Sequence, residues 1–126
     1  MGGNRLTGIR VLLLEDETLI NMGTQAILET MGCIVTSVLH ASEAMSALDD
    51  EMPEIAVLDI NLGSDRTSYD VAQRLIENGV PFVFLTGYNP GTLPSKWQSY
   101  PICHKPCHPE ELEALMTSAL ARGQSA

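Results

Sequence analysis

The stretch IRVLLLEDE (residues 9–17) joins a short apolar run directly to consecutive acidic residues. An apolar run of this length is typical of a strand that is buried on both faces of a sheet. The residues that follow change to a helical pattern. Apolar side chains recur on one face as far as Met31, and Gly32 is a suitable residue to end the helix. This part of the chain is therefore predicted to form a strand, an acidic turn and a helix.

The same alternation of apolar runs and helical patterns continues along the chain. The later predicted strands cover residues 33–39, 54–62, 80–87 and 100–104. Further helices are predicted to begin near Ser42, Ser68 and Pro109. Short connections between alternating strands and helices indicate a parallel sheet with helices on both faces. We therefore predict an α/β fold with a doubly wound five-stranded parallel sheet, in the common strand order 2-1-3-4-5.

One segment departs from this alternation, between the fourth and fifth predicted strands. It reads YNPGTLPSKWQSYP (88–101) and contains three prolines. Proline is tolerated only near the start of a helix, so the fourth helix is predicted to be short or irregular. The only tryptophan of the chain, Trp97, lies here. Two interpretations stay open for it: a packing anchor for a segment with few other apolar side chains, or a contact residue for a partner protein.

Composition restricts the class of protein. The 126 residues fit one domain with a single core, and we expect that domain over 1–126 with its core at about residues 8–122. No apolar run approaches the roughly 18 residues of a membrane span, and no secretory signal is recognised. The formal charge of −9, with seven Lys and Arg, argues against nucleic-acid binding. We therefore expect a cytoplasmic protein with neither nucleic acid nor membrane as a partner.

The cysteines form no recognisable disulfide framework. Cys33, Cys103 and Cys107 are odd in number, which favours free thiols in a reducing compartment. The stretch CHKPCH (103–108) also invites a zinc interpretation. However, consecutive residues of a strand point to opposite faces, and zinc motifs usually pair two separated ligand doublets. We therefore expect no metal in this stretch, and we place Cys103 in the core.

Polar groups follow four of the five predicted strands at their carboxyl ends. They are Glu15 and Asp16, Asp59, Thr86 and Lys105. Because these ends lie at one edge of a parallel sheet, and the first and third strands are neighbours in the predicted order, the acids should converge. Three carboxylates repel one another unless a cation lies among them. Mg²⁺ binds one or two carboxylates together with water and phosphate oxygens, so the sequence predicts a magnesium site.

The chemistry of this set suits phosphoryl transfer to a carboxylate. Aspartate is an established phosphoryl acceptor in enzymes. Catalysis of such a transfer consists largely of positioning the groups and neutralising charge on the phosphoryl oxygens. The metal and Lys105 would supply positive charge, and the Thr86 hydroxyl could bond an oxygen of the group that binds between them.

At these positions the sequence resembles the receiver domain of response regulators, over nearly the whole chain. The family pattern is an acidic pair, a phosphoacceptor Asp, a Ser or Thr, and a Lys-Pro pair, each after one strand. Here these are Glu15-Asp16, Asp59, Thr86-Gly87 and Lys105-Pro106. The resemblance implies a flavodoxin-like or CheY-like fold and a bacterial two-component signalling module with no output domain of its own.

The same resemblance assigns roles to these residues. Asp59 would accept phosphate from a histidine kinase or a phosphotransfer protein. Lys105 would pair with the phosphoryl group, and Thr86 would move toward it as part of a switch. The implied magnesium ligands are Asp16, Asp59 and the backbone carbonyl of Asn61, with Glu15 acting through water. The chain would then be no conventional enzyme. It would dock a downstream protein through the segment before the fifth strand, that strand and the last helix.

Two features bear on the subfamily. The family usually has an aromatic switch residue three positions before the lysine, where this chain has Ile102. The stretch PFVFLTGY (81–88) resembles single-domain receivers whose fourth strand reads Phe-Ala-Thr-Gly-Tyr, which makes Tyr88 the candidate switch residue with Thr86. In addition, DINLGSDRTSYDVA (59–72) resembles receivers found with bacterial kinases of the general-stress and light-signalling type.

Three other functions are considered. Ile102 leaves open a pseudo-receiver that docks without phosphorylation. A magnesium phosphohydrolase usually carries a second acid two residues after its strand-end Asp, where this chain has Asn61. A nucleotide- or flavin-binding domain needs glycine-rich amides after the first strand, whereas the acidic run here would repel phosphate.

Overall fold

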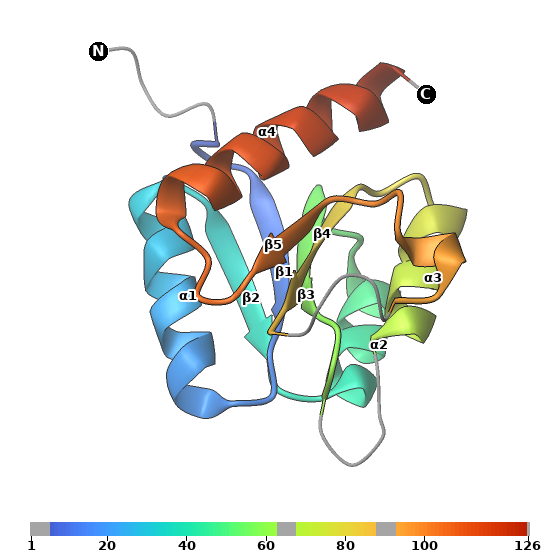
Figure 1. Cartoon of the computed structure of the whole chain (residues 1–126), viewed down its shortest axis with the longest axis horizontal. Coiled ribbons are helices and arrows are strands. Elements are labelled where there is room, and N and C mark those ends of the chain that lie inside the picture. The colour runs from blue at the N-terminus through green and yellow to red at the C-terminus, as the bar shows by residue number, and fades with distance from the viewer. Residues whose placement is uncertain (1–5, 63–67, 88–92, 126) are drawn as a thin grey trace.

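A computed structural model describes residues 6–62, 68–87 and 93–125 of the chain. Strands and helices alternate along it (Figure 1). The strands are β1 (Arg10–Leu14), β2 (Ile34–Val38), β3 (Ile55–Asp59), β4 (Phe82–Thr86) and β5 (Ile102–His104). The helices are α1 (Thr18–Thr30), α2 (Ala41–Asp50), α3 (Tyr69–Glu77) and α4 (Pro109–Ser125), with a short 3₁₀ helix η2 (Ser95–Trp97) before β5.

The strands form one parallel sheet in the order β2-β1-β3-β4-β5. This order confirms the predicted topology, including the neighbouring positions of the first and third strands. Leu14 of β1 is aligned with Leu58 of β3, and Asp59 is aligned with Leu85 of β4. Because all strands run in the same direction, their carboxyl ends lie at one edge of the sheet.

Helices cover both faces of the sheet, and alternate side chains of the strands supply two separate cores. On one face, Leu13 and Val57 pack with Leu28 of α1 and Met116 of α4. On the other face, Leu14 and Leu58 lie in a cluster with residues of α2 and α3 (Figure 1). The sheet is therefore the middle layer of three, as the alternating pattern predicts.

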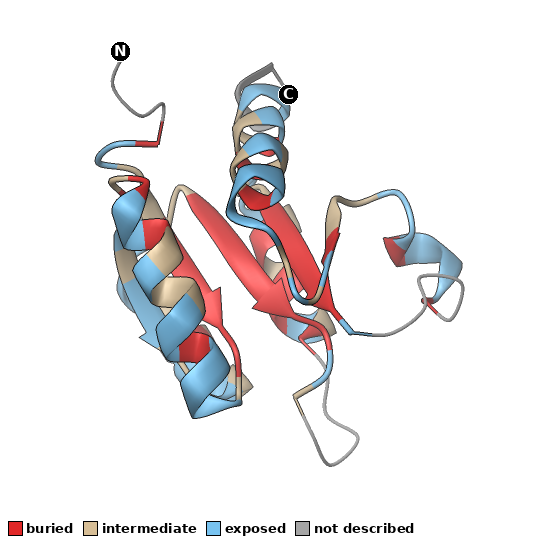
Figure 2. Ribbon diagram, turned by 60° about the vertical axis from the view of Figure 1, so that its left-hand side comes forward, coloured by how far each residue is buried: buried red, intermediate tan, exposed pale blue. Residues whose placement is uncertain are grey.

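The central strands are buried along their whole length. Every residue of β3 and β4 is buried, whereas the edge strand β2 carries Ile34 with 59% of its surface exposed (Figure 2). Continuous apolar runs are what a strand covered on both faces requires. The acidic residue at the end of β3, Asp59, is thus held on a rigid and buried element.

Among the described residues 93–101, the segment before β5 forms the single 3₁₀ turn η2, in agreement with the prediction of a short or irregular fourth helix. Trp97 at its end has 5% of its surface exposed. Its ring stacks on Tyr69 at 5.1 Å between centroids and meets Phe84 edge-on at 5.7 Å. These contacts support the packing-anchor interpretation of Trp97.

The prediction of free thiols is right for one cysteine and wrong for two. Cys33 is a buried free cysteine, but Cys103 and Cys107 form a disulfide. Their Cα atoms lie 5.8 Å apart, within the usual range for a disulfide, because the chain turns at Lys105 and Pro106. Counting cysteines could not reveal this short loop. Cys103 lies in the core, as predicted.

No helix among the described residues combines the length and apolar character that crossing a membrane requires.

Candidate functional site

The strand order brings the acids after β1 and β3 together, as the sequence predicts. Glu15, Asp16 and Asp59 each offer a carboxylate oxygen within 4.8 Å of the others. Glu15 is fully buried, Asp59 has 3% of its surface exposed, and Asp16 is half-buried. These carboxylates therefore form a compact group at the carboxyl edge of the sheet, largely withdrawn from solvent.

Glu15 is fixed through its backbone as well as its side chain. Its backbone N–H donates to the carbonyl of Val38 at 3.2 Å, which continues the contact between β1 and β2. Its Oε2 accepts a hydrogen bond from the backbone N–H of Glu17 at 2.9 Å. The turn that follows β1 thus helps to orient the Glu15 carboxylate.

Asn21 supports the same turn, and the sequence interpretation missed it. The side chain is buried, and its Nδ2 donates to the carbonyls of Glu15 and Val38, at 3.1 Å in each case. It therefore joins α1 to the ends of β1 and β2. The available signal was a polar residue in the first turn of α1, on the side of the helix that faces the sheet.

Lys105 reaches these carboxylates from the end of β5, the last strand of the sheet. Its backbone N–H donates to the carbonyl of Thr86 at 2.8 Å, which holds the end of β5 against β4. Its Nζ lies 2.7 Å from Oε1 of Glu15 and 3.1 Å from Oδ2 of Asp59. The peptide bond between Lys105 and Pro106 is cis. One ammonium group thus bridges the acids of two strands.

The pKa values of Glu15 and Asp59 are shifted in opposite directions. Burial, reinforced by the negative charge of Glu15, raises the pKa of Asp59 from 3.8 to about 7, although Lys105 opposes the rise. Burial alone would also raise the pKa of Glu15. However, the bonds from Lys105 and from the Glu17 N–H hold that pKa below its ordinary value. The ionised form is therefore less stable for Asp59 than for Glu15.

Lys105 remains a cation in this setting. Burial alone would lower its pKa, but the contacts with Glu15 and Asp59 outweigh burial and raise it. The side chain is therefore a fixed positive charge beside the Asp59 carboxylate. A group with negatively charged oxygens that approached Asp59 would meet this ammonium.

The donor set fits a hard divalent cation. Mg²⁺ prefers carboxylate and carbonyl oxygens, and the group supplies carboxylates from Glu15, Asp16 and Asp59. Burial and the charge of Glu15 raise the pKa of Asp59 in spite of the Lys105 ammonium, so the ionised form of Asp59 is disfavoured in the absence of a further cation. An added cation would stabilise the ionised form of Asp59. Asn61, whose backbone carbonyl is the remaining predicted ligand, lies just beyond the end of β3.

Of the two predicted switch residues, Thr86 and Tyr88, the structure describes only Thr86. Thr86 is the last residue of β4 and is buried. Tyr88 lies outside the described residues. Ile102, at the position where the family usually has an aromatic residue, is half-buried and packs against the core shared with α2 and α3.

A second group of possible metal ligands lies around the start of α4. Cys103, Cys107 and Glu111 each bring a ligand atom within 4.8 Å of the others. Both sulfurs are joined in the disulfide, so the thiolates that zinc would require are absent from this form of the chain.

Comparison with known proteins identifies the family to which this fold belongs. The family model described as the response regulator receiver domain matches residues 11–117. The chain belongs to this family. The receiver domain is 32% identical to the response regulator Rre1 of Synechocystis sp. over 93% of this chain and 54% of Rre1. It spans about half the length of the curated relatives that it matches.

Solved structures agree with this assignment. The receiver domain matches the response regulator PhyR from Brucella abortus with a TM-score of 0.82 and 28% identity, over 97% of this chain and 51% of PhyR. It matches SdrG from Sphingomonas melonis Fr1 with a TM-score of 0.79 and 29% identity, over 90% of this chain and 97% of SdrG. The five-stranded fold is therefore that of a receiver domain.

Proposed function

We propose that this receiver domain accepts a phosphoryl group on Asp59 from a histidine kinase or a phosphotransfer protein, in two-component signal transduction. The observation that carries the proposal is the position of the Asp59 carboxylate. It lies among the acids Glu15 and Asp16 and is 3.1 Å from the Lys105 ammonium. A nucleophilic oxygen is thus placed beside a fixed positive charge, as transfer of a phosphoryl group to a carboxylate requires.

In this mechanism an oxygen of ionised Asp59 forms a bond to phosphorus while the bond between phosphorus and the donor histidine nitrogen breaks. The electron pair of the broken bond leaves with the imidazole nitrogen. Lys105 binds the oxygens of the transferred group and compensates their charge. These residues position the group and supply charge for a single acceptor event, so the domain is a phosphoacceptor and not a conventional enzyme.

Magnesium fits this site as its cofactor. Asp16, Asp59 and the backbone carbonyl of Asn61 would hold the ion, with Glu15 acting through water. When bound, the ion would neutralise charge on the phosphoryl oxygens. Its ligands would lie at the ends of β1 and β3, the two strands whose pairing places the acids together.

Phosphorylation would act as a switch for protein contacts. The Thr86 hydroxyl would bond a phosphoryl oxygen, and Tyr88 would move with the residues that follow β4. The downstream partner would be a protein that docks on the surface formed by η2, β5 and α4. This surface adjoins the site because Lys105 follows β5 directly.

The proposal is tested by incubating the chain with phosphoramidate and MgCl₂ and following its intact mass. One phosphoryl adduct is expected, and chelation with EDTA should abolish it. Asp59→Asn should remove the adduct, whereas the matched change Asp50→Asn, at an exposed position at the end of α2, should leave it unchanged. An adduct that survives in Asp59→Asn, or its absence from the unaltered chain, would refute the proposal.

A second candidate is a pseudo-receiver that docks without phosphorylation. One observation favours it: Ile102 stands where the family usually has an aromatic switch residue. The same mass assay separates the candidates, because a pseudo-receiver would acquire no adduct. Steady release of phosphate from small phosphomonoesters would instead indicate a magnesium phosphohydrolase.

A further inference from the structure

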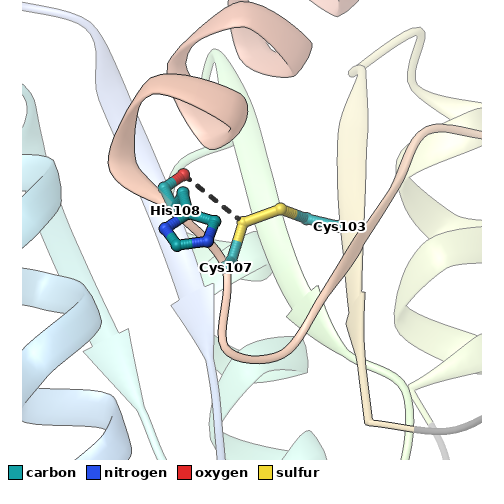
Figure 3. Close-up of a disulfide and its surroundings, with 3 residues drawn as sticks. All are labelled: Cys103, Cys107 and His108. Carbon is teal, nitrogen blue, oxygen red and sulfur yellow. Dashed lines mark hydrogen bonds between the residues drawn. A yellow bond between two sulfur atoms is a disulfide. The ribbon is translucent and has the colours of Figure 1, made fainter.

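The disulfide encloses the lysine of the candidate site. Cys103 is the middle residue of β5, and Cys107 lies on the loop that leads into α4 (Figure 3). Lys105 is midway between them, so the cross-link closes a ring of the chain around it. The ring begins at the buried residue of β5 and includes the residue whose Nζ contacts Glu15 and Asp59.

The two cysteines differ in access, as a reacting pair of thiols requires. Cys103 is fully buried in the core, whereas Cys107 is half-buried and lines a cavity of about 410 Å³ together with Ile20 of α1 and Leu112 of α4. A small disulfide reagent can therefore approach Cys107 first. Cys103 is held at the distance needed to attack the Cys107 sulfur of a mixed disulfide.

The fold can also accommodate Cys107 as a free thiol. The Cys107 sulfur lies 3.8 Å from the carbonyl oxygen of His108, and a thiol at that position can donate a weak hydrogen bond to it (Figure 3). The carbonyl group of His108 is kept in place because it also accepts from the N–H of Leu112 in the first turn of α4. Both oxidation states of Cys107 are thus accommodated by the fold.

We propose that Cys103 and Cys107 form a reversible thiol–disulfide switch that controls how firmly Lys105 is positioned beside Asp59. The oxidant is a small-molecule disulfide such as oxidised glutathione. The Cys107 thiolate attacks one of its sulfurs, forms a mixed disulfide and releases one glutathione. The Cys103 thiolate then attacks the Cys107 sulfur and releases the second glutathione. The protons of the two protein thiols end on the two released glutathiones.

The consequence for phosphorylation rests on the proposed function. The N–H of Lys105 is anchored to Thr86 on β4, and the disulfide anchors the chain two residues farther along. Closing the ring removes conformational freedom from the loop that carries the ammonium. A lysine held in place loses less entropy when it binds a transferred group, so the oxidised chain should be phosphorylated faster than the reduced chain.

The thiol chemistry is tested in glutathione buffers of graded redox ratio, with acid quenching and alkylation of the denatured chain. The oxidised chain should accept one alkyl group, on Cys33, and the reduced chain should accept three. Cys107→Ser should accept two in every buffer, and Cys33→Ser should keep the transition. A chain that forms no disulfide at any ratio, or that retains stoichiometric zinc once reduced, overturns the proposal.

The effect on Lys105 is tested without phosphorylation, using an amine-acylating reagent and peptide mass mapping. Lys96 is the other lysine of the chain and is an internal control on an exposed part of η2. Reduction should raise the acylation rate of Lys105 at least about threefold and leave Lys96 unchanged. Equal rates for Lys105 in both redox states overturn the link between the cysteines and the lysine.

The final measurement compares phosphorylation of the oxidised and reduced chains by phosphoramidate. The oxidised chain should react at least about threefold faster, and both Cys107→Ser and Cys107→Ala should react at the slower rate whatever the buffer. Equal rates in both states overturn the switch. If neither state is phosphorylated, the proposed function fails, and the alkylation and acylation results still decide whether the cysteines control Lys105.

Discussion

The ammonium of Lys105 lies 2.7 Å from the carboxylate of Glu15, although the two residues are 90 positions apart in the sequence. Lys105 follows β5 at one edge of the sheet, whereas Glu15 follows β1, with β3 and β4 between them. The lysine side chain therefore extends across the ends of the intervening strands. This contact ties the edge of the sheet to a fully buried acid near its middle.

Replacing Lys105 should impair both stability and phosphorylation. Lys105→Met leaves Glu15 and Asp59 buried without their cation, which should lower the free energy of unfolding by about 2 kcal/mol. The rate of phosphorylation should fall at least roughly tenfold, because charge on the phosphoryl oxygens loses its compensation. Urea unfolding and intact mass measure the two effects. Lys96→Met is the matched control, and equal behaviour of the two variants would contradict this role of Lys105.

Stability without magnesium should fall as the pH rises toward neutrality. The pKa of Asp59 is about 7 in the folded chain, against 3.8 as its ordinary value, so the folded state binds more protons between these pH values. The favourable contribution is complete below about pH 3.8 and is lost as the pH rises through about 7. The slope from this group can reach about 1.4 kcal/mol per pH unit.

Asp59→Asn isolates this effect from the contributions of the other titratable groups. The variant should show a flatter curve of unfolding free energy against pH than the unaltered chain, and greater stability at pH 8. Urea unfolding in EDTA at a series of pH values measures both. Asp50→Asn should keep the original slope. If the difference between the Asp59 variant and the unaltered chain does not depend on pH, Asp59 does not titrate as described.

The parts of the structure that the sequence predicted depend on local patterns. Apolar runs such as residues 11–14 and 55–58 indicate the buried strands, and the polar residues at four of the five strand ends can be identified from the chain alone. Parallel strand direction then places Asp59 beside Glu15, since their strands are neighbours. The short fourth helical segment followed from its prolines.

The parts that were missed depend on contacts between distant elements. Asn21 reads as an ordinary helix residue until the carbonyls of Glu15 and Val38 are placed beside it. The difference in pKa between Glu15 and Asp59 requires the position of the Lys105 ammonium, which no spacing in the sequence supplies. The disulfide depended on a turn geometry that the pattern CHKPCH does not encode.

Magnesium should stabilise the folded chain through the acids at the ends of β1 and β3. A ligand at about 100 times its dissociation constant adds about 2.7 kcal/mol, which thermal unfolding at rising MgCl₂ concentration detects. Asp16→Asn should weaken the response, because it removes one of the predicted ligands. Glu17→Gln, an exposed neighbour outside the predicted ligand set, is the matched control. A response that Asp16→Asn leaves unchanged would place the ion elsewhere.

Trp97 should contribute to the stability of the fold and not to the phosphoacceptor chemistry. Its ring is buried against Tyr69 of α3 and Phe84 of β4, at the end of η2. Trp97→Ala should therefore lower the free energy of unfolding by about 3 kcal/mol, and Trp97→Phe should recover part of the loss. Urea unfolding measures these values, with the exposed Ser95→Ala as control. Phosphorylation by phosphoramidate should continue in the folded variants. Unchanged stability in Trp97→Ala would show that this ring is not the anchor of the segment, and would favour its role as a contact for a partner protein.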